Sequence, residues 1–332
     1  MLKEILLRFG LAALARPILG GAGAILVFHR IRAVDPALSF SPNYRNSVAP
    51  EAFERLLDSL AEDGVEILGL EEAMLRQQKP GNGRFVCLTF DDGYRDNHDT
   101  LLPIIAARQV PITVYISPGL IDGSAPLWWY ALEQAIEREK LLRLPMPEET
   151  ELSIGDGAAK QRAFDAVGAF MLTARPEASA RMTQALADRY GADFAALAAC
   201  HMMDWDMVRR LAACPLVEIG AHSVSHPALA VLDEATASHE MSASRDRLEH
   251  ETGRPVCHFA YPYGTELTVS AREFRLAASL GFRTAVTTTP GNLMRRHSAT
   301  RHRLPRHGIG PADGPAALRL KLAGLRNPLR RG

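Results

Sequence analysis

The sequence lacks several features that mark common classes of protein. Its 38 Lys and Arg residues are balanced by 38 Asp and Glu residues, so no charge excess predicts binding to nucleic acid or to a strongly basic partner. Only four cysteines occur, none of them in a Cys-x-x-Cys pair, which excludes zinc-ribbon and thioredoxin-like motifs. The absence of internal repeats and low-complexity segments excludes a repeat architecture.

Long apolar runs are also missing. Arg8 and Arg16 interrupt the N-terminal region, and the uncharged stretch 17–28 is shorter than the roughly 20 apolar residues that a membrane-spanning helix needs. No small-residue cleavage site follows a clean apolar region, which argues against a secretory signal. We therefore expect no stable membrane span and a cytoplasmic protein, with residues 1–23 forming a helical segment ahead of the first core strand.

The C-terminal tail, residues 311–332, is basic. No acid follows Asp313, and Leu318, Leu322 and Leu325 recur at helical spacing. The basic residues of this tail are Arg319, Lys321, Arg326, Arg330 and Arg331. We expect a solvated terminal helix; peripheral contact with the anionic surface of the inner membrane is the alternative.

Strand-like and helical segments alternate along the chain. Short apolar segments rich in branched and aromatic residues are typical of buried strands, and they occur at 24–29, 85–90, 112–117, 216–222, 256–260 and 283–288. Amphipathic helices are predicted between them. One begins at Pro50, a favoured first helical residue, and another runs from the capping box of Ser270 and Glu273 to Gly281. This alternation predicts a parallel sheet in an α/β barrel or a doubly wound fold.

One long segment interrupts the alternation. Between about Trp128 and Asp204 the sequence contains no convincing strand, and helical patterns cover 132–142, 161–173 and 179–190. The segment is too long for a bare loop. We interpret it as a helical insertion between two strands of the sheet.

Two adjacent carboxylates, Asp91 and Asp92, follow the strand-like segment 85–90. Carboxylates at the end of a buried strand are costly unless they are paired or bind a metal, and in α/β folds such strand ends are where sites form. Successive strand residues point to opposite sides, so both carboxylates can reach one site only through a turn, which Gly93 can supply. The alternative is a solvated Asp-Asp-Gly turn.

Two histidines, His222 and His226, follow the strand-like segment 216–222. In a helical turn this spacing places two imidazoles on one face, where they can bind one metal; the alternative is a pair of ordinary surface histidines. Joined by a carboxylate, they would form a three-ligand site with open positions, which is typical of catalytic rather than structural metals. Such a ligand set suits Zn²⁺, with Co²⁺ or Ni²⁺ as alternatives.

A third segment, Tyr261-Pro262-Tyr263-Gly264, ends another strand. Rings around a proline can stack on a sugar, and a backbone N–H can stabilise an oxyanion. In their order along the chain, Thr-Phe-Asp-Asp-Gly, His-Ser-x-x-His and Tyr-Pro-Tyr-Gly resemble the motifs of the polysaccharide deacetylases of carbohydrate esterase family 4, which include the chitooligosaccharide deacetylases of the nodulation protein B type. The resemblance extends from the strand at Phe28 to about Gly310, apart from the insertion.

The resemblance implies a distorted (β/α) barrel of about seven parallel strands, which would occupy residues 24–310 with the insertion at about 128–204. It also implies Asp91 as the general base and the backbone N–H of Tyr263 as the oxyanion donor. The metal ligands that it implies are Asp92, His222 and His226.

The sequence departs from the family pattern in two places. Ala260 stands where the family has an Arg that orients the base, and we hypothesise that Arg306, in the C-terminal Leu-Pro-Arg segment, replaces it. The family's Leu-x-His, which supplies the general acid, is also missing. His29 and His307 are the candidates, with His29 better placed at the end of the first strand; a structural histidine bonded to Asp91 is the alternative for His29.

These residues together predict metal-dependent hydrolysis of N-acetyl groups on the amino sugars of a polysaccharide, an oligosaccharide or a lipid-linked glycan. Tyr261, Tyr263, Trp128 and Trp129 are candidates for packing against the sugar, although the Trp pair could simply anchor the insertion. An amidase for non-sugar amides on the same barrel and a non-catalytic sugar-binding protein are the alternatives.

Overall fold

A parallel sheet forms the centre of the protein. The computed structural model describes residues 20–33, 40–77 and 84–325. Its main sheet follows the order β11-β10-β9-β6-β5-β1-β12, and β4 pairs with β5 beside this path. The strands are β1 (Gly23–Phe28), β4 (Val65–Ile67), β5 (Arg84–Phe90), β6 (Ile112–Ile116), β9 (Val217–Ala221), β10 (His258–Ala260), β11 (Thr284–Val286) and β12 (His307–Gly308). All of these neighbours pair in parallel.

The sheet curls into the predicted distorted barrel. Leu304 forms a parallel bridge with Val286 of β11, and β12 follows it and pairs with β1. The C-terminal segment thereby runs from one end of the sheet to the other. The α/β fold class, with about seven parallel strands, is confirmed.

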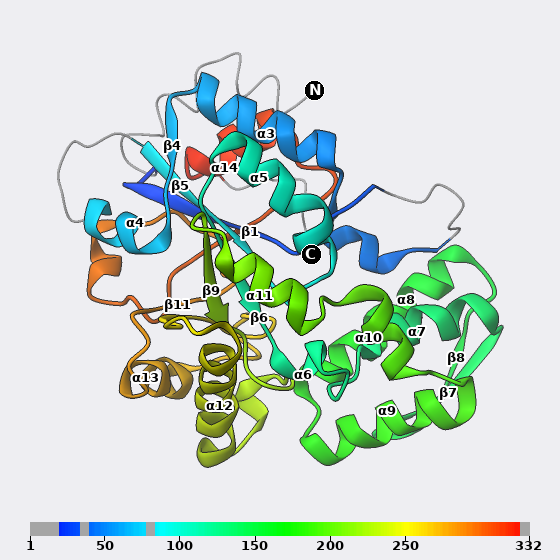
Figure 1. Ribbon diagram of the computed structural model, residues 1–332. Helices are drawn as coiled ribbons and strands as arrows, with labels where there is room; N and C mark the ends of the chain where they lie inside the picture. Colours follow the sequence, from blue (N-terminus) through cyan, green and yellow to red (C-terminus); the bar gives the residue numbers. More distant parts are fainter. Residues whose placement is uncertain (1–19, 34–39, 78–83, 326–332) are drawn as a thin grey trace.

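Helices follow most of the strands and surround the sheet (Figure 1). They are α3 (Pro50–Glu62), α4 (Leu70–Gln77), α5 (Leu102–Arg108), α6 (Pro118–Ile121), α11 (Trp205–Ala213), α12 (Glu234–Thr252), α13 (Ala271–Ser279) and α14 (Pro315–Leu322). Short elements connect them: β2 (Arg30–Ile31), β3 (Ser47–Val48), η1 (Pro42–Asn46), η2 (Asn97–Leu101), η3 (Leu229–Val231) and η4 (Arg295–Ser298).

The predicted start of α3 and the predicted start and end of α13 depend on local capping, and the structure confirms them. Pro50 is the first residue of α3, where its missing N–H costs nothing. Ser270 caps α13 and forms a capping box with Glu273. Gly281, just past the end of α13, has φ +82°, a left-handed conformation that glycine adopts without strain.

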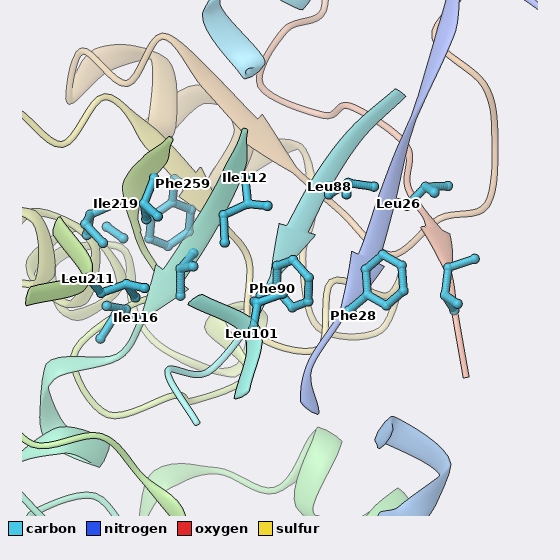
Figure 2. Close-up of a cluster of buried hydrophobic side chains, with 14 of the residues drawn as sticks. Leu26, Phe28, Leu88, Phe90, Leu101, Ile112, Ile116, Leu211, Ile219 and Phe259 are labelled. Atoms are coloured by element: carbon cyan, nitrogen blue, oxygen red, sulfur yellow. The ribbon is translucent and has the colours of Figure 1, made fainter. Parts of the chain in front are cut away.

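Aromatic and aliphatic side chains from β1, β5, β6 and the covering helices form the main core (Figure 2). Phe28 and Phe90 are paired in the register of β1 and β5; their rings stack at 5.1 Å, and the ring of Phe53 lies edge-on to Phe28 at 5.4 Å. Each such buried ring contributes roughly 1.5–3 kcal/mol. Because this packing fixes the end of β5, it also fixes the backbone that leads into Asp91.

The insertion has its own hydrophobic core, formed by residues such as Leu132, Phe164 and Leu186. Its elements are α7 (Trp128–Arg138), β7 (Leu141–Met146), β8 (Glu148–Ser153), α8 (Gly157–Thr173), α9 (Pro176–Tyr190) and α10 (Phe194–His201). In Figure 1 these elements lie to one side of the barrel.

The prediction that this segment contains no strand is wrong, because β7 and β8 form an antiparallel hairpin. The helix predicted over 132–142 ends instead at Arg138. The error has a physical cause. Leu142 and Leu144 alternate with exposed residues, but Pro145 and the glutamates of β8 are typical of loops. Only two buried leucines carry the strand signal.

The C-terminal helix α14 is packed rather than fully solvated. Leu318 and Leu322 join the main core, and Arg319 forms an ion pair with Asp63 at 2.7 Å. No helix in the described part of the chain is long and apolar enough to cross a membrane. The predicted helical segment 1–23 lies almost entirely outside the described residues, as do Arg326, Arg330 and Arg331.

Candidate active site

Asp91 follows β5 and is paired with a buried arginine. Arg306, fully buried just ahead of β12, donates from Nη1 to Asp91 Oδ1 at 2.7 Å and from Nη2 to Oδ2 at 2.6 Å. Arg306 is itself held by the carbonyl oxygen of Thr287 at 2.9 Å. Burial alone would raise the pKa of Asp91, but the guanidinium outweighs it and lowers that pKa below its ordinary value. A bidentate pair of this kind keeps the carboxylate ionised and oriented.

Asp92 turns away from the strand and meets the two histidines. Its φ is +78° and that of Gly93 is +85°, so this turn brings the second carboxylate to the same site as the first. Asp92 Oδ1 lies 3.3 Å from Nε2 of His222 and 3.3 Å from Nε2 of His226. Although Oδ1 is buried, no hydrogen bond in the described part of the chain satisfies it.

This arrangement fits a divalent metal ion. One ligand atom each from Asp92, His222 and His226 lies within 4.8 Å of the others. A buried carboxylate oxygen without a hydrogen bond is costly in a native structure, and a cation between these donors would satisfy it. Two imidazoles and one carboxylate are a ligand set that leaves open positions for water and substrate.

The two histidines converge through a loop rather than the helical turn that their spacing predicts. Ser223 and His226 have φ of +60° and +58°, which is rare for residues with a side chain. The carbonyl oxygen of Ala260 lies 2.7 Å from Nδ1 of His222. This bond orients the ring so that Nε2 is available as a ligand atom.

Glu240 on α12 holds this loop, although the sequence pattern does not indicate it. Its carboxylate accepts from the backbone N–H of Val224 at 2.8 Å and of Ser225 at 2.9 Å, and from the hydroxyl of Ser225 at 2.7 Å. Glu240 carries no local signal, because it lies in the middle of a long polar helix and reaches the loop only in the folded chain.

In the aromatic turn, residues 261–264, one tyrosine lies in the core and the other lies at the site. Tyr261 is buried, and its hydroxyl donates to the carbonyl oxygen of His302 at 2.8 Å. Its ring packs against Phe259 and Phe274. The expectation that Tyr261 contacts the sugar is therefore wrong: its backbone N–H still pairs with β11 at Val286, so the side chain follows the strand into the core.

Tyr263, in contrast, lines the site in a strained backbone conformation. Its φ is +59°, and the N–H of Gly264 donates to the carbonyl oxygen of Pro262 at 2.6 Å, which makes Tyr263 the centre of a γ-turn. Such conformations cost about 1–3 kcal/mol and occur mainly at functional sites. The ring of Tyr263 contacts that of His226 at 4.7 Å, and its hydroxyl accepts from Trp128 Nε1 at 3.2 Å.

A cavity of about 360 Å³ joins these groups, within the size range of small-molecule sites. Asp91, Asp92, both motif histidines and Tyr263 line it, as do His29, Trp128 and Trp129. Both carboxylate oxygens of Asp91 are bonded to Arg306, and the alternative bond between His29 and Asp91 is not formed among the described side chains. His307 lies elsewhere: its Nε2 bonds Asn292 Oδ1 at 2.8 Å, and burial lowers its pKa to about 4.

A second buried ion pair lies where the barrel meets the insertion. Arg30 Nε donates to Asp96 at 2.7 Å and Arg30 Nη1 donates to the hydroxyl of Tyr130 at 2.6 Å. The guanidinium also lies 4.6 Å from the ring centre of Tyr94, whose hydroxyl accepts from Trp129 Nε1 at 3.2 Å. The Trp129 ring in turn lies 5.5 Å from that of His226. The insertion is thus held against the site by buried contacts.

The fold and the site together define a (β/α) barrel hydrolase. In it, a buried carboxylate that is paired with an arginine lies beside three potential metal ligands. The family model for polysaccharide deacetylases matches residues 78–145 and 162–285, more than half of the 332 residues. This chain belongs to the polysaccharide deacetylase family, and the prediction of an enzyme of this class is confirmed. No curated protein sequence matches it.

Solved structures show the same fold at low sequence identity. The chain is similar to the Streptococcus pyogenes deacetylase PplD in complex with acetate, with a TM-score of 0.60 and 18% identity over 90% of this chain and 97% of that one. It is also similar to IcaB from Ammonifex degensii, with a TM-score of 0.58 and 16% identity over 92% and 98% of the two chains. A de-N-acetylase from Aggregatibacter actinomycetemcomitans matches with a TM-score of 0.56 and 13% identity over 90% and 99%.

Proposed function

We propose that this enzyme hydrolyses N-acetyl groups on the amino sugars of an oligosaccharide, polysaccharide or lipid-linked glycan, and that it needs a divalent metal, with Zn²⁺ the first choice and Co²⁺ or Ni²⁺ as alternatives. The observation that carries the proposal is the position of Asp91. This buried, ionised carboxylate lines the same cavity as the three potential metal ligands. Membership of the family supports the same reaction.

In this proposal the metal ligands are Asp92, His222 and His226. A divalent ion bound there polarises a carbonyl group and lowers the pKa of a water molecule toward about 7. Asp91 accepts the proton of the attacking water, and Arg306 keeps Asp91 ionised for that step. The N–H of Tyr263 donates to the oxyanion, and loss of one such donor typically costs about 10²–10³ in rate.

The leaving amine needs a proton, and we propose that His29 supplies it. His29 lines the cavity, whereas His307 is bonded to Asn292 away from it. An aryl ester offers a test because its phenolate leaves without a proton. His29→Asn is expected to lower kcat on an N-acetyl sugar much more than on 4-nitrophenyl acetate. Equal losses on both substrates would remove His29 as the acid.

The primary experiment measures acetate release from N-acetylglucosamine oligomers with added Zn²⁺ or Co²⁺. Asp91→Asn is expected to lower kcat by about 10²–10⁴, the usual contribution of a general base. Asp99→Asn is the matched control, since Asp99 is an exposed carboxylate eight positions along the chain. Metal-dependent release that only the Asp91 variant loses is the expected result.

Two other outcomes would redirect the proposal. Hydrolysis of small non-sugar amides without release from sugars would identify an amidase on the same barrel. Binding of sugar oligomers without any acetate release, in protein that still binds metal, would identify a sugar-binding protein.

A further inference from the structure

A strongly basic segment follows β11, away from the residues of the cavity. Between Phe274 and Ala312 the chain contains no Asp or Glu. Within this stretch, residues 295–303 carry four arginines, all of them exposed. We call residues 295–303 the arginine segment. Its basic and imidazole side chains are Arg295, Arg296, His297, Arg301, His302 and Arg303.

The four exposed arginines have no counterion in the fold. Within the described residues, no ion pair or hydrogen bond involves any of their guanidinium groups. The acids of α4, the helix that contacts η4, are bonded to other cations: Glu71 pairs with Arg283 at 2.8 Å, and Glu72 pairs with Arg76 at 3.2 Å. The positive charge of the arginine segment is therefore not neutralised from within the described chain.

The charges of the segment also lie close to one another. Burial lowers the pKa of His297, and the charges of Arg296 and Arg303 lower it further, so guanidinium groups from both ends of the segment act on one ring. Like charges on one surface repel one another, and nothing in the fold offsets that repulsion. Because the whole chain is neutral, with 38 basic and 38 acidic residues, the segment gives the molecule one basic face. Such a face indicates an anionic partner.

This face lies at the amino ends of the barrel strands, whereas the cavity lies at their carboxyl ends. Leu293, just ahead of the segment, bridges Gly23 at the start of β1, and the carbonyl oxygen of Arg301 accepts from the N–H of Ala285 in β11 at 2.9 Å. The other end of β1, a strand of 6 residues, leads into His29 at the cavity, so roughly 20 Å separates the two ends. In Figure 1 the orange arginine segment lies beside α4, across the barrel from the insertion.

Both ends of the described chain adjoin the same face. The N–H of Ala22 donates to the carbonyl oxygen of Leu293 at 2.8 Å, and the side-chain amide of Asn292 donates to the carbonyl oxygen of Leu322 in α14 at 3.1 Å. The two end segments of the sequence therefore connect to the folded chain next to the arginine segment.

The sequences of these end segments indicate which anionic partner fits the face. Residues 1–19 are mostly apolar and contain three basic residues against one acid, and residues 326–332 contain three arginines and no acid. Apolar residues combined with cations suit the headgroup region of an anionic bilayer. A nucleic acid would satisfy the cations but would offer nothing to the apolar residues.

We propose that the arginine segment docks the enzyme on an anionic lipid bilayer. The four guanidinium groups donate hydrogen bonds to the phosphates of the headgroups, and the two end segments add basic and apolar residues at the same surface. The cavity then lies at the far end of the barrel from the bilayer, where glycan in the aqueous phase can reach it. This docking does not depend on the reaction that the cavity catalyses.

The test measures binding of the full chain to phosphatidylcholine vesicles with and without phosphatidylglycerol. We expect the wild type to bind only the vesicles that contain phosphatidylglycerol, and to bind them more weakly as salt is added. Replacing the four arginines of the segment by Gln is expected to lower the affinity about 10²–10³-fold, since each cation at such a surface contributes about fivefold. Replacing them by Lys, which keeps the charges, is expected to retain most of the binding and guards against misfolding.

The matched control makes the same change in net charge on the insertion. It replaces by Gln four exposed arginines that have no printed ion pair with the barrel: Arg138, Arg162, Arg175 and Arg181. We expect this variant to bind the vesicles as the wild type does. Acetate release from soluble N-acetylglucosamine oligomers is expected to be the same in all of these variants, so failure of the docking and failure of the proposed function are separate results.

Three outcomes would overturn the docking. One is a wild-type enzyme that does not bind vesicles containing phosphatidylglycerol. Another is an equal loss of affinity in the control variant, which would assign the binding to net charge rather than to this face. The third is binding of double-stranded DNA through the same arginines without binding of vesicles, which would identify a nucleic-acid surface instead.

Discussion

The barrel and the insertion contribute to one cavity in different ways. The side chains from the barrel lie at strand ends, where the strand backbone and charged partners hold them. Asp91, for example, is held by Arg306. The insertion contributes rings that are held by single hydrogen bonds and by stacking, as Trp128 is by Tyr263. The difference suggests a division of labour in which the barrel determines the reaction and the insertion determines the substrate.

The largest effects are expected from the two buried arginines. Arg306→Met and Arg30→Met each break a buried ion pair, which typically costs about 3–5 kcal/mol of stability. Both variants should therefore have a lower Tm, but we expect only Arg306→Met to lower kcat by about 10²–10⁴, because only Arg306 bonds Asp91, the proposed base. Arg30→Met should mainly raise KM, since Arg30 supports Tyr94 and Tyr130, and Tyr94 bonds Trp129 at the cavity.

Steady-state kinetics at a temperature where both variants are folded would decide this. Equal losses of kcat in the two variants would contradict the division between barrel and insertion.

The loop between the two histidines provides the next test, on the barrel side. Glu240→Gln weakens the charge-assisted bonds to Val224 and Ser225, so the histidines should be less well placed for a metal. We expect metal affinity to fall about 10–100-fold, as for other residues that orient ligands, measured by Zn²⁺ titration against a competing chelator. His239→Gln, an exposed neighbour on α12, is the control. An unchanged metal affinity in the Glu240 variant would show that the loop does not need this carboxylate to place the histidines.

A smaller loss of kcat is expected from breaking the contact between Trp128 of the insertion and Tyr263 of the barrel. Trp128→Phe and Tyr263→Phe each remove the hydrogen bond between these residues, which is worth about 0.5–1.5 kcal/mol. If the bond also steadies the strained turn at Tyr263, each variant should lose several-fold in kcat. The double variant should then lose little more than either single variant. Additive losses in kcat would show that the two side chains act independently.

The smallest expected effect is a pH dependence of stability that comes from His201, at the contact between the insertion and the barrel. Burial, with a contribution from Arg30, lowers the pKa of His201 from 6.5 to about 4. Between these values the unfolded chain binds a proton that the folded chain does not, so stability is lost as pH falls through this range. After allowance for its partial exposure, His201 should account for about 1–2 kcal/mol.

Urea unfolding at pH 7 and pH 4.5 measures this loss, and His201→Gln should lose less than the wild type. The comparison isolates His201, because His307, whose pKa burial also lowers to about 4, is present in both proteins. An equal loss in the two proteins would assign the pH dependence to other groups.

The sequence predicted the barrel well, because its signals are local. The buried strands, the proline at the start of α3 and the capping box of α13 each depend on neighbouring residues. The positions of Asp91 and Asp92 followed from the strand before them. The hairpin of β7 and β8 escaped prediction because only two leucines carry its pattern.

Contacts between distant segments could not be read from the sequence. Tyr261 and Tyr263 look equivalent along the chain, but hydrogen bonding to β11 keeps Tyr261 in the sheet, while the turn releases Tyr263. Glu240 and Arg30 support residues of the site through tertiary contacts alone. The contact of Arg306 with Asp91 was hypothesised from a missing arginine in a motif, and the geometry now supplies the distances on which its proposed role depends.

The pair of Asp91 and Arg306 also has a consequence for the order in which the enzyme is completed. The two residues are 215 positions apart, and proteins emerge from the ribosome N-terminus first. All three donor residues and the aromatic turn are synthesised before Arg306, so a nascent chain can assemble most of the site while Asp91 still lacks its partner. A buried carboxylate without a partner favours its protonated form, which cannot accept a proton. If Asp91 is the general base, as proposed, the enzyme becomes competent only when the segment that carries Arg306 has docked.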